Sequence, residues 1–165
     1  MKLYLMRHGP AEDRADSGLD SDRALTSTGR DRVRNVGKML LDLEEAPAHI
    51  VTSPLARSVQ TAEIVAIASK LSARGGTVQV RRELSPGAAA DAVVLARRAA
   101  HEGLKRVLLV GHEPDLTGLA AALLHGFHRT FDKGMVVGLH LPADGGHARL
   151  RFVLDPRTLT LETPS

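Results

Sequence analysis

One feature constrains the fold of this 165-residue chain more than any other: short apolar runs alternate with longer segments in which apolar residues recur at helical spacing. The runs Lys2–Met6, His49–Thr52 and Arg106–Val110 each lead into a polar turn, which is typical of buried strands. A weaker strand is predicted at Thr77–Val80. Parallel strands need long crossover connections, usually helices. The alternation therefore predicts a mostly parallel sheet that is covered on both faces.

The segments between these runs predict helices. Thr28 is a candidate N-cap for the first helix, whose apolar residues recur three and four positions apart. Ser53 and Pro54 predict the cap and the first residue of a second helix, because proline is well tolerated where its missing N–H has no partner. Two further helices are expected over 91–101 and 116–124.

Near the C-terminus, the spacing of the apolar residues changes from that of helices to that of strands. The segments Met135–Leu141 and Arg149–Leu154 are joined by a stretch that contains Asp144-Gly145-Gly146, which favours a hairpin. The expected fold is a three-layer α/β/α sandwich with a mostly parallel central sheet and a C-terminal β-hairpin. Because no repeat or linker divides the chain, we expect one domain over 1–165.

Composition excludes several classes of function. The chain has no cysteine, which rules out disulfides, thiolate metal sites and a cysteine nucleophile. Its arginines are not clustered, its net charge is +3 and only 2% of its residues are aromatic, so we expect no nucleic-acid partner. The apolar run at the N-terminus is too short for a signal peptide, and no run is long enough to span a bilayer. We therefore expect a cytoplasmic protein without a membrane partner.

Four side chains are expected to meet at one edge of the sheet, since ligands of open α/β sheets bind beyond the carboxyl ends of the strands. His8 follows the first predicted strand, with Arg7 just before it, and His112 follows the fourth. Arg57 lies in the first turn of the second helix, near backbone N–H groups that favour an anion. Two guanidinium groups and two imidazoles predict a pocket that binds a dianionic phosphate without a metal.

Three motifs in a fixed order carry a resemblance to a known family. They are Arg7-His8-Gly9 after the first strand, Ser53-Pro54 with Arg57 and Gln60-Thr61-Ala62, and Gly111-His112 after a later strand. In this order they resemble the histidine phosphatase (phosphoglycerate mutase-like) superfamily. Within it, the stretches 7–12, 111–116 and 133–134 are most similar to the small SixA-type phosphohistidine phosphatases.

The resemblance implies a two-step phosphoryl transfer. His8 attacks phosphorus and becomes a phosphohistidine, which water then hydrolyses. Arg7, Arg57 and His112 hold the phosphate oxygens, and no metal or cofactor takes part. Neighbouring positive charge lowers the pKa of an imidazole and keeps it neutral, as a nucleophile must be.

The general acid is left open by the resemblance. Glu83 stands where the mutase-like members have a glutamate that protonates the leaving oxygen, and we place it ahead of Glu12 and Glu113. SixA-type members do not clearly depend on such an acid, because imidazole is a better leaving group than an alkoxide. No long insertion precedes Glu83 to cap the pocket. We therefore expect the substrate to be phosphohistidine on a signalling protein.

Two alternatives follow from the same residues. The chain can be a small-molecule phosphomonoesterase of the same superfamily, or a phosphate-binding module without catalysis. A mutase is disfavoured because the chain looks too short to enclose and reorient an intermediate. His125 and His128 have the spacing of a metal-binding pair, but without a third ligand they are expected in a loop or cap. The sequence does not fix the oligomeric state.

Overall fold

Seven strands form a single sheet in the computed structural model, which describes residues 1–164. They are β1 (Lys2–Arg7), β2 (His49–Thr52), β3 (Thr77–Val80), β4 (Arg106–Gly111), β5 (Val136–His140), β6 (Arg149–Leu154) and β7 (Leu161–Glu162). Their order across the sheet is β3-β2-β4-β1-β5-β6-β7. The pairs β1–β4, β2–β4 and β2–β3 are parallel, whereas β5 pairs antiparallel with β1 and β6. The predicted sandwich and its C-terminal hairpin are confirmed, and the short antiparallel strand β7 is an addition.

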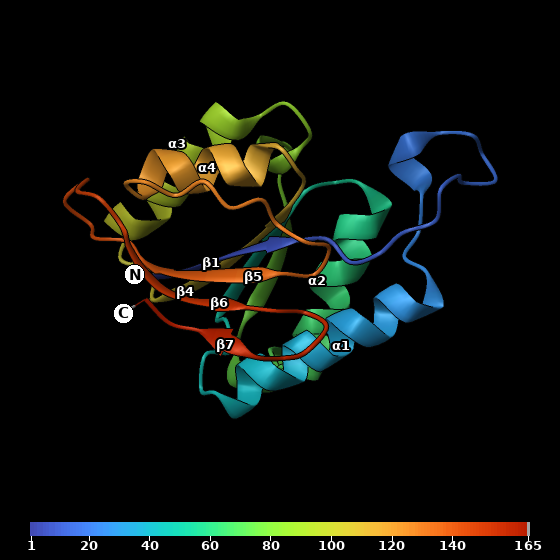
Figure 1. Ribbon diagram of the computed structural model, residues 1–165, viewed down its shortest axis with the longest axis horizontal. Coiled ribbons are helices and arrows are strands. Elements are labelled where there is room, and N and C mark those ends of the chain that lie inside the picture. The colour runs from blue at the N-terminus through green and yellow to red at the C-terminus, as the bar shows by residue number, and fades with distance from the viewer. Residues whose placement is uncertain (165) are drawn as a thin grey trace.

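Helices cover both faces of this sheet (Figure 1). They are α1 (Ser27–Asp42), α2 (Ala56–Ala68), α3 (Ala89–His101) and α4 (Asp115–Leu123). Helices α1 and α2 lie on one face, and α3 and α4 on the other. Alternate residues of β1 serve the two layers: Leu3 and Leu5 belong to one apolar cluster, Tyr4 and Met6 to the other. Within residues 1–164, no helix is both long and apolar enough to cross a membrane.

Both predicted N-caps are wrong. The cap of α1 is Thr26, whose hydroxyl oxygen accepts a hydrogen bond from the Gly29 amide at 2.9 Å, so Thr28 lies within the first turn. Leu55 occupies the N-cap position of α2 and makes no side-chain cap. Ser53 and Pro54 precede α2, which begins at Ala56. The Ser53 hydroxyl oxygen accepts a hydrogen bond from the Leu55 amide at 3.3 Å and also contacts a second partner, described below.

Strand register brings the two motif histidines together. β1 and β4 are adjacent and parallel, with Arg7 opposite Gly111. The residues that follow these strands therefore emerge side by side, and the His8 amide donates to the Gly111 carbonyl at 3.2 Å. The loop over 11–25 projects from this same edge of the sheet (Figure 1). The carboxyl edge is thus the place where the predicted pocket forms.

Gly37 permits the close contact between α1 and α2. A Cβ there would lie 2.8 Å from the Ala68 Cβ and 3.2 Å from the Val65 Cα. Helix propensity alone predicts that Gly37→Ala stabilises the protein by about 1 kcal/mol. We expect the opposite, a net loss of about 1–3 kcal/mol in the free energy of unfolding, because the backbone of α2 at Val65 cannot move away to make room for the added Cβ.

Urea denaturation of Gly37→Ala and Gly118→Ala tests this expectation. Gly118 lies in α4, where a Cβ would come no nearer than 3.7 Å to the Ala89 Cβ, so propensity should dominate and the variant should not lose stability. A Gly37→Ala protein that is more stable than the wild type would contradict the steric argument.

Candidate active site

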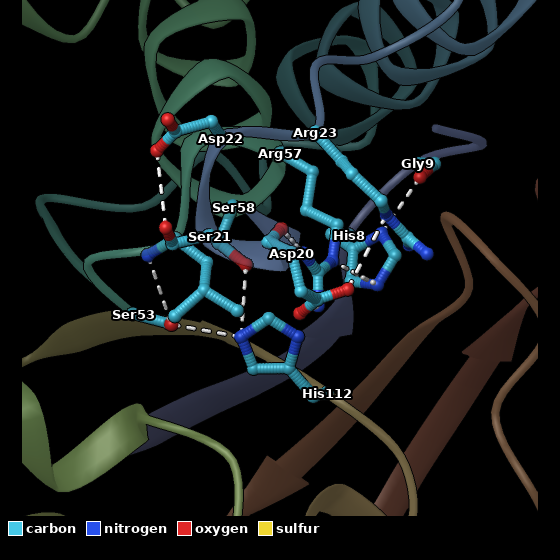
Figure 2. Close-up of polar contacts among 11 residues, drawn as sticks. His8, Gly9, Asp20, Ser21, Asp22, Arg23, Ser53, Arg57, Ser58 and His112 are labelled. Carbon is cyan, nitrogen blue, oxygen red and sulfur yellow. Dashed lines mark hydrogen bonds and ion pairs between the residues drawn. The ribbon is translucent and has the colours of Figure 1, made fainter. Parts of the chain in front are cut away.

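His8 is buried at the carboxyl end of β1, with 4% of its surface exposed. Its Nδ1 lies 2.7 Å from the Gly9 carbonyl oxygen, which can only accept, so Nδ1 carries the hydrogen. Nε2 therefore keeps its lone pair, and it accepts a hydrogen bond from Arg57 Nε at 3.3 Å (Figure 2). The backbone thus fixes the tautomer in which the lone pair is on Nε2.

The His8 imidazole is held neutral by its surroundings. Burial lowers its pKa to about 3, and the charges of His112, Arg57 and Arg7 act in the same direction. The hydrogen bond to Gly9 opposes these effects without overcoming them. The ring of His112 lies with its centroid 5.2 Å from that of His8. Near pH 7 the ring is therefore in the form that can attack phosphorus.

His112 is the second buried imidazole of the site. Its Nε2 lies 2.7 Å from the Ser53 hydroxyl oxygen and 3.3 Å from that of Ser58 (Figure 2). The pKa of His112 is lowered to about 4, mainly by burial and next by the positive charge of Arg57. Its Nδ1 is buried without a hydrogen-bond partner. The two serines fix the ring and leave Nδ1 free to contact a ligand.

Arg57 is buried in the first turn of α2, where it faces His8 and the carboxyl edge. Its Nη1 donates to the Asp20 carbonyl at 2.9 Å, and its Nη2 donates to Asp20 Oδ2 at 3.1 Å. The Thr61 hydroxyl donates to the Arg57 carbonyl at 2.7 Å and accepts from the Gly9 amide at 3.1 Å. One hydroxyl group thereby joins the loop after β1 to the helix that carries Arg57.

Arg7 is positioned by a loop that precedes β5. Its Nη1 donates to the Phe131 carbonyl at 2.8 Å, while its Nε is buried without a partner. The Glu113 carboxylate accepts from the Phe131 amide at 3.3 Å and from the Thr117 hydroxyl at 2.7 Å. Glu113 thus fixes the loop that orients Arg7. Unpaired buried donors are costly, so Arg7 Nε and His112 Nδ1 favour binding of an acceptor such as phosphate.

Comparison with known proteins gives the family. The model of the histidine phosphatase superfamily (branch 1) matches residues 3–85. The chain belongs to the histidine phosphatase superfamily. Phosphohistidine phosphatase SixA of Escherichia coli (strain K12) is 32% identical over 127 residues, 76% of each chain. An uncharacterized protein of Picosynechococcus sp. is 38% identical over 169 residues, covering 99% of this chain and 97% of the relative.

The fold of this histidine phosphatase is shared with solved structures. The structure of the protein histidine phosphatase SixA complexed with tungstate superimposes with a TM-score of 0.88 at 27% identity. The superposition covers 97% of this chain and all of the other. The architecture that positions the four motif side chains is therefore that of a SixA-like phosphatase.

The three candidate acids of this histidine phosphatase lie in different settings. Glu83, in the short helix Arg82–Leu84, accepts from Arg81 Nη2 at 2.9 Å and lines a small pocket together with His112. The hydrogen bond from Arg81 lowers the pKa of the Glu83 carboxyl, which favours its ionised form. Glu12 is exposed in the loop after β1. Glu113 is occupied by the contacts with Phe131 and Thr117.

Sequence reasoning missed four polar residues of this site. Ser53 and Ser58 contact His112, but a serine before proline at a helix start is ordinarily interpreted as a cap. Asp20 and Arg23 come from the loop over 11–25, where Asp20 pairs with Arg57. That loop has no hydrophobic period, so the sequence carried no signal for where its side chains lie.

The histidines outside the motifs do not change this description. His125 and His128 lie in the loop after α4, as expected. The exposed rings of His125 and His147 contact each other at a tilt of 41°, with centroids 3.8 Å apart. Across residues 1–164, no group of three or more His, Cys, Asp or Glu side chains is arranged to hold a metal ion.

The two buried imidazoles predict a loss of stability in mild acid. A histidine of the unfolded chain titrates near pH 6.5, whereas the folded-state pKa values of His8 and His112 are about 3 and about 4. Between these values the unfolded chain binds more protons. The free energy of unfolding therefore falls as the pH decreases below 6.5, by up to about 1.4 kcal/mol per pH unit for each histidine.

Urea unfolding between pH 7 and pH 5 measures this slope. Carboxylates with lowered pKa values, such as Glu45, lose their contribution only at lower pH, below about 4.5. The double variant His8→Asn/His112→Asn should show a shallower slope than the wild type. His101→Asn, which replaces an exposed histidine of α3, should keep the wild-type slope. Equal slopes for the double variant and the wild type would refute the assignment.

Proposed function

We propose that this histidine phosphatase removes phosphate from phosphohistidine on a signalling protein, through a covalent phospho-His8 intermediate. The observation that carries the proposal is the neutral, buried imidazole whose Nε2 lone pair faces Arg57 while the Gly9 carbonyl holds Nδ1–H. Similarity to a phosphohistidine phosphatase supports the substrate class. Tungstate in the SixA structure supports binding of a phosphate-like oxyanion here.

In the first step, His8 Nε2 attacks phosphorus along the line of the leaving bond. The new N–P bond forms as the bond to the substrate imidazole breaks, and that imidazole takes up a proton from water. The Gly9 carbonyl stabilises the positive charge that develops on the His8 ring through the Nδ1–H hydrogen bond. Arg57, Arg7 and His112 donate to the oxygens of the transferring group, where most of the catalytic stabilisation arises.

In the second step, water attacks phosphorus and the Nε2–P bond breaks. The water oxygen forms the new P–O bond, and both hydrogens of that water stay with the phosphate, one of them then neutralising the hydroxide left by the first step. Inorganic phosphate leaves, and Nε2 recovers its lone pair. Burial, and with it the surrounding positive charge, lowers the pKa of His8, which also makes the ring a good leaving group from phosphorus. The proposal uses no metal or cofactor, because the arginines supply the charge that neutralises the phosphoryl oxygens.

Access for a protein substrate is supported by the short connections around the site. Between the end of α2 at Ala68 and Glu83 lie only the single turn Ser72–Arg74 and the four-residue strand β3. Within the proposal, residues 1–165 act as one phosphatase domain, since the strands share one sheet. A phosphorylated side chain of another protein can approach a site without a helical cap more readily than one beneath a cap.

Relative turnover tests the proposed substrate class. We expect the kcat/KM for a phosphohistidine-bearing phosphotransfer protein to exceed that for sugar phosphates and for an activated aryl phosphate. Preferential hydrolysis of sugar phosphates through His8 would replace the proposal with a small-molecule phosphomonoesterase. Absence of turnover on all three substrates, with phosphate still bound, would favour a binding module.

Glu83→Gln is expected to affect phosphate esters more than phosphohistidine. An alkoxide needs a proton as it leaves, and a lost general acid typically costs about 10²-fold or more in rate. An imidazole leaves more readily, so turnover of phosphohistidine should change by less than about threefold. The negative charge of a bound phosphoryl group opposes the effect of Arg81 on the Glu83 carboxyl, which lets it act as an acid.

Steady-state kinetics of Glu83→Gln on an alkyl phosphate and on a phosphohistidine protein measure both effects. Glu63→Gln, at an exposed position of α2, is the matched control and should leave both rates unchanged. Equal losses on the two substrates would show that Glu83 does not protonate the leaving group.

A further inference from the structure

Three of the four buried side-chain polar atoms that lack a hydrogen-bond partner within residues 1–164 belong to one region. Two are Arg7 Nε and His112 Nδ1, already placed at the site. The third is Nε of Arg23, which directly follows the short helix Asp20–Asp22 and belongs to none of the motifs. A guanidinium donor without a hydrogen bond, beside two such donors of the site, favours binding of an anion with several acceptor oxygens.

Arg23 is firmly placed by the base of its loop. Leu25 donates its amide to Gln60 Oε1 of α2 at 2.8 Å and forms an isolated antiparallel bridge with Ala11. The Thr26 amide donates to the Pro10 carbonyl at 3.0 Å. Two residues before Leu25, the Arg23 side chain is only 26% exposed and points toward His8 and Asp20 (Figure 2). Its position near the nucleophile is thus set by the fold.

The Asp20 carboxylate stands between Arg57 and Arg23. Asp20 Oδ2 accepts from Arg57 Nη2 at 3.1 Å, and Oδ1 lies 3.4 Å from Arg23 Nε, in ion-pair range without forming a hydrogen bond. With Nη1 on the Asp20 carbonyl and Nε on His8, every nitrogen of Arg57 is engaged. Nη1 and Nη2 each keep a second N–H. A phosphoryl group that takes the Nη2 donor now held by the Asp20 carboxylate must displace that carboxylate.

We propose that Arg23 is a further ligand of the phosphoryl group, and that Asp20 occupies Arg23 and Arg57 until this group displaces its carboxylate. The inference rests on the proposed function, because it places the phosphoryl group at His8. Asp20 can withdraw, since its side chain is 64% exposed and lies farther from the anchored base of the loop. Asp20 raises and Arg23 lowers the pKa of His112, which agrees with their position beside that ring.

The chemistry of the exchange is that of one anion for another. A carboxylate carries one negative charge and two acceptor oxygens, whereas a phosphoryl group carries up to two charges and three acceptors. Guanidinium groups bind phosphate strongly through paired N–H donors. The phosphoryl group can therefore take over the donors held by Asp20 and also accept a hydrogen bond from Arg23 Nε, which Asp20 contacts only as an ion pair.

Calorimetric titration with tungstate, and then with inorganic phosphate, tests the inference independently of any substrate. We expect Arg23→Gln to weaken tungstate binding about tenfold, since it removes a charge-assisted hydrogen bond. Arg23→Lys should show a smaller loss. Asp20→Asn should strengthen binding several-fold, because the competing charge is gone. With phosphohistidine protein as substrate, Arg23→Gln should raise KM more than it lowers kcat.

Charge-matched controls come from the same loop. Arg14→Gln and Asp16→Asn replace exposed residues and should leave tungstate binding within about twofold of the wild type. Wild-type binding by Arg23→Gln, or weaker binding by Asp20→Asn in a protein of wild-type thermal stability, would overturn the inference while leaving the proposed function intact. A wild-type protein that binds neither tungstate nor phosphate would overturn both.

Discussion

Replacement of His8 by alanine is expected to lower kcat by about 10⁴-fold or more, because the covalent route disappears with its nucleophile. No neighbouring group can take the place of Nε2: Arg57 is a cation, and His112 Nε2 is bound by Ser53 and Ser58. Phosphate release from a phosphohistidine protein and from an aryl phosphate measures the loss.

Three observations separate a chemical effect from a structural one. His8→Ala should still bind tungstate, since Arg7, Arg57 and His112 remain, and its unfolding should stay cooperative. His101→Ala, at an exposed position of α3, is the matched control and should retain full activity. If His8→Ala kept activity within about 100-fold of the wild type, covalent catalysis by His8 would be excluded.

Arg57→Gln is expected to lower kcat/KM by about 10²–10³-fold, comparable to removal of one preorganised donor to a developing charge. The variant loses a positive charge and the hydrogen bond from Arg57 Nε to His8 Nε2. Loss of that charge also raises the pKa of His8, because Arg57 is one of the groups that lowers it. Both changes act against attack on phosphorus.

Steady-state kinetics of Arg57→Gln and Arg57→Lys separate charge from geometry. Lysine keeps the charge but lacks the planar fork of donors, so Arg57→Lys should recover only part of the activity. Arg34→Gln replaces a solvent-exposed arginine that pairs with Asp31 on α1, and serves as control. Full activity in Arg57→Lys would show that only the positive charge at position 57 is needed, and would contradict a role for the paired N–H donors of Arg57 in binding the phosphoryl oxygens.

The core of the site is predictable because it depends on short patterns and one topological rule. Each of His8 and His112 follows an apolar run, and the carboxyl ends of parallel strands share one edge. Arg57 follows from its place in the first turn of a helix. The structure adds what sequence alone left open for His8, since the Gly9 carbonyl places the hydrogen on Nδ1 and the lone pair on Nε2.

The parts of the site and of the fold that the sequence does not predict depend on contacts between segments that are distant in sequence. Asp20 and Arg23 reach the site because Leu25 is tied to Gln60 of α2, 35 residues away, and no local pattern encodes that contact. Gly37 looks unfavourable within a helix until its contact with Ala68 is seen. Strand β7 has only two residues, too few for any periodic signal.

Trapping of the intermediate tests the central claim most directly. Wild-type protein would be mixed with a phosphotransfer protein that carries labelled phosphate on histidine, quenched in alkali at millisecond intervals, and digested for mass spectrometry. We predict that label appears transiently on His8, bound at Nε2, and that free phosphate follows at the rate at which this label decays. Release of free phosphate without label on His8 at any time, or with label on another residue, would contradict the mechanism.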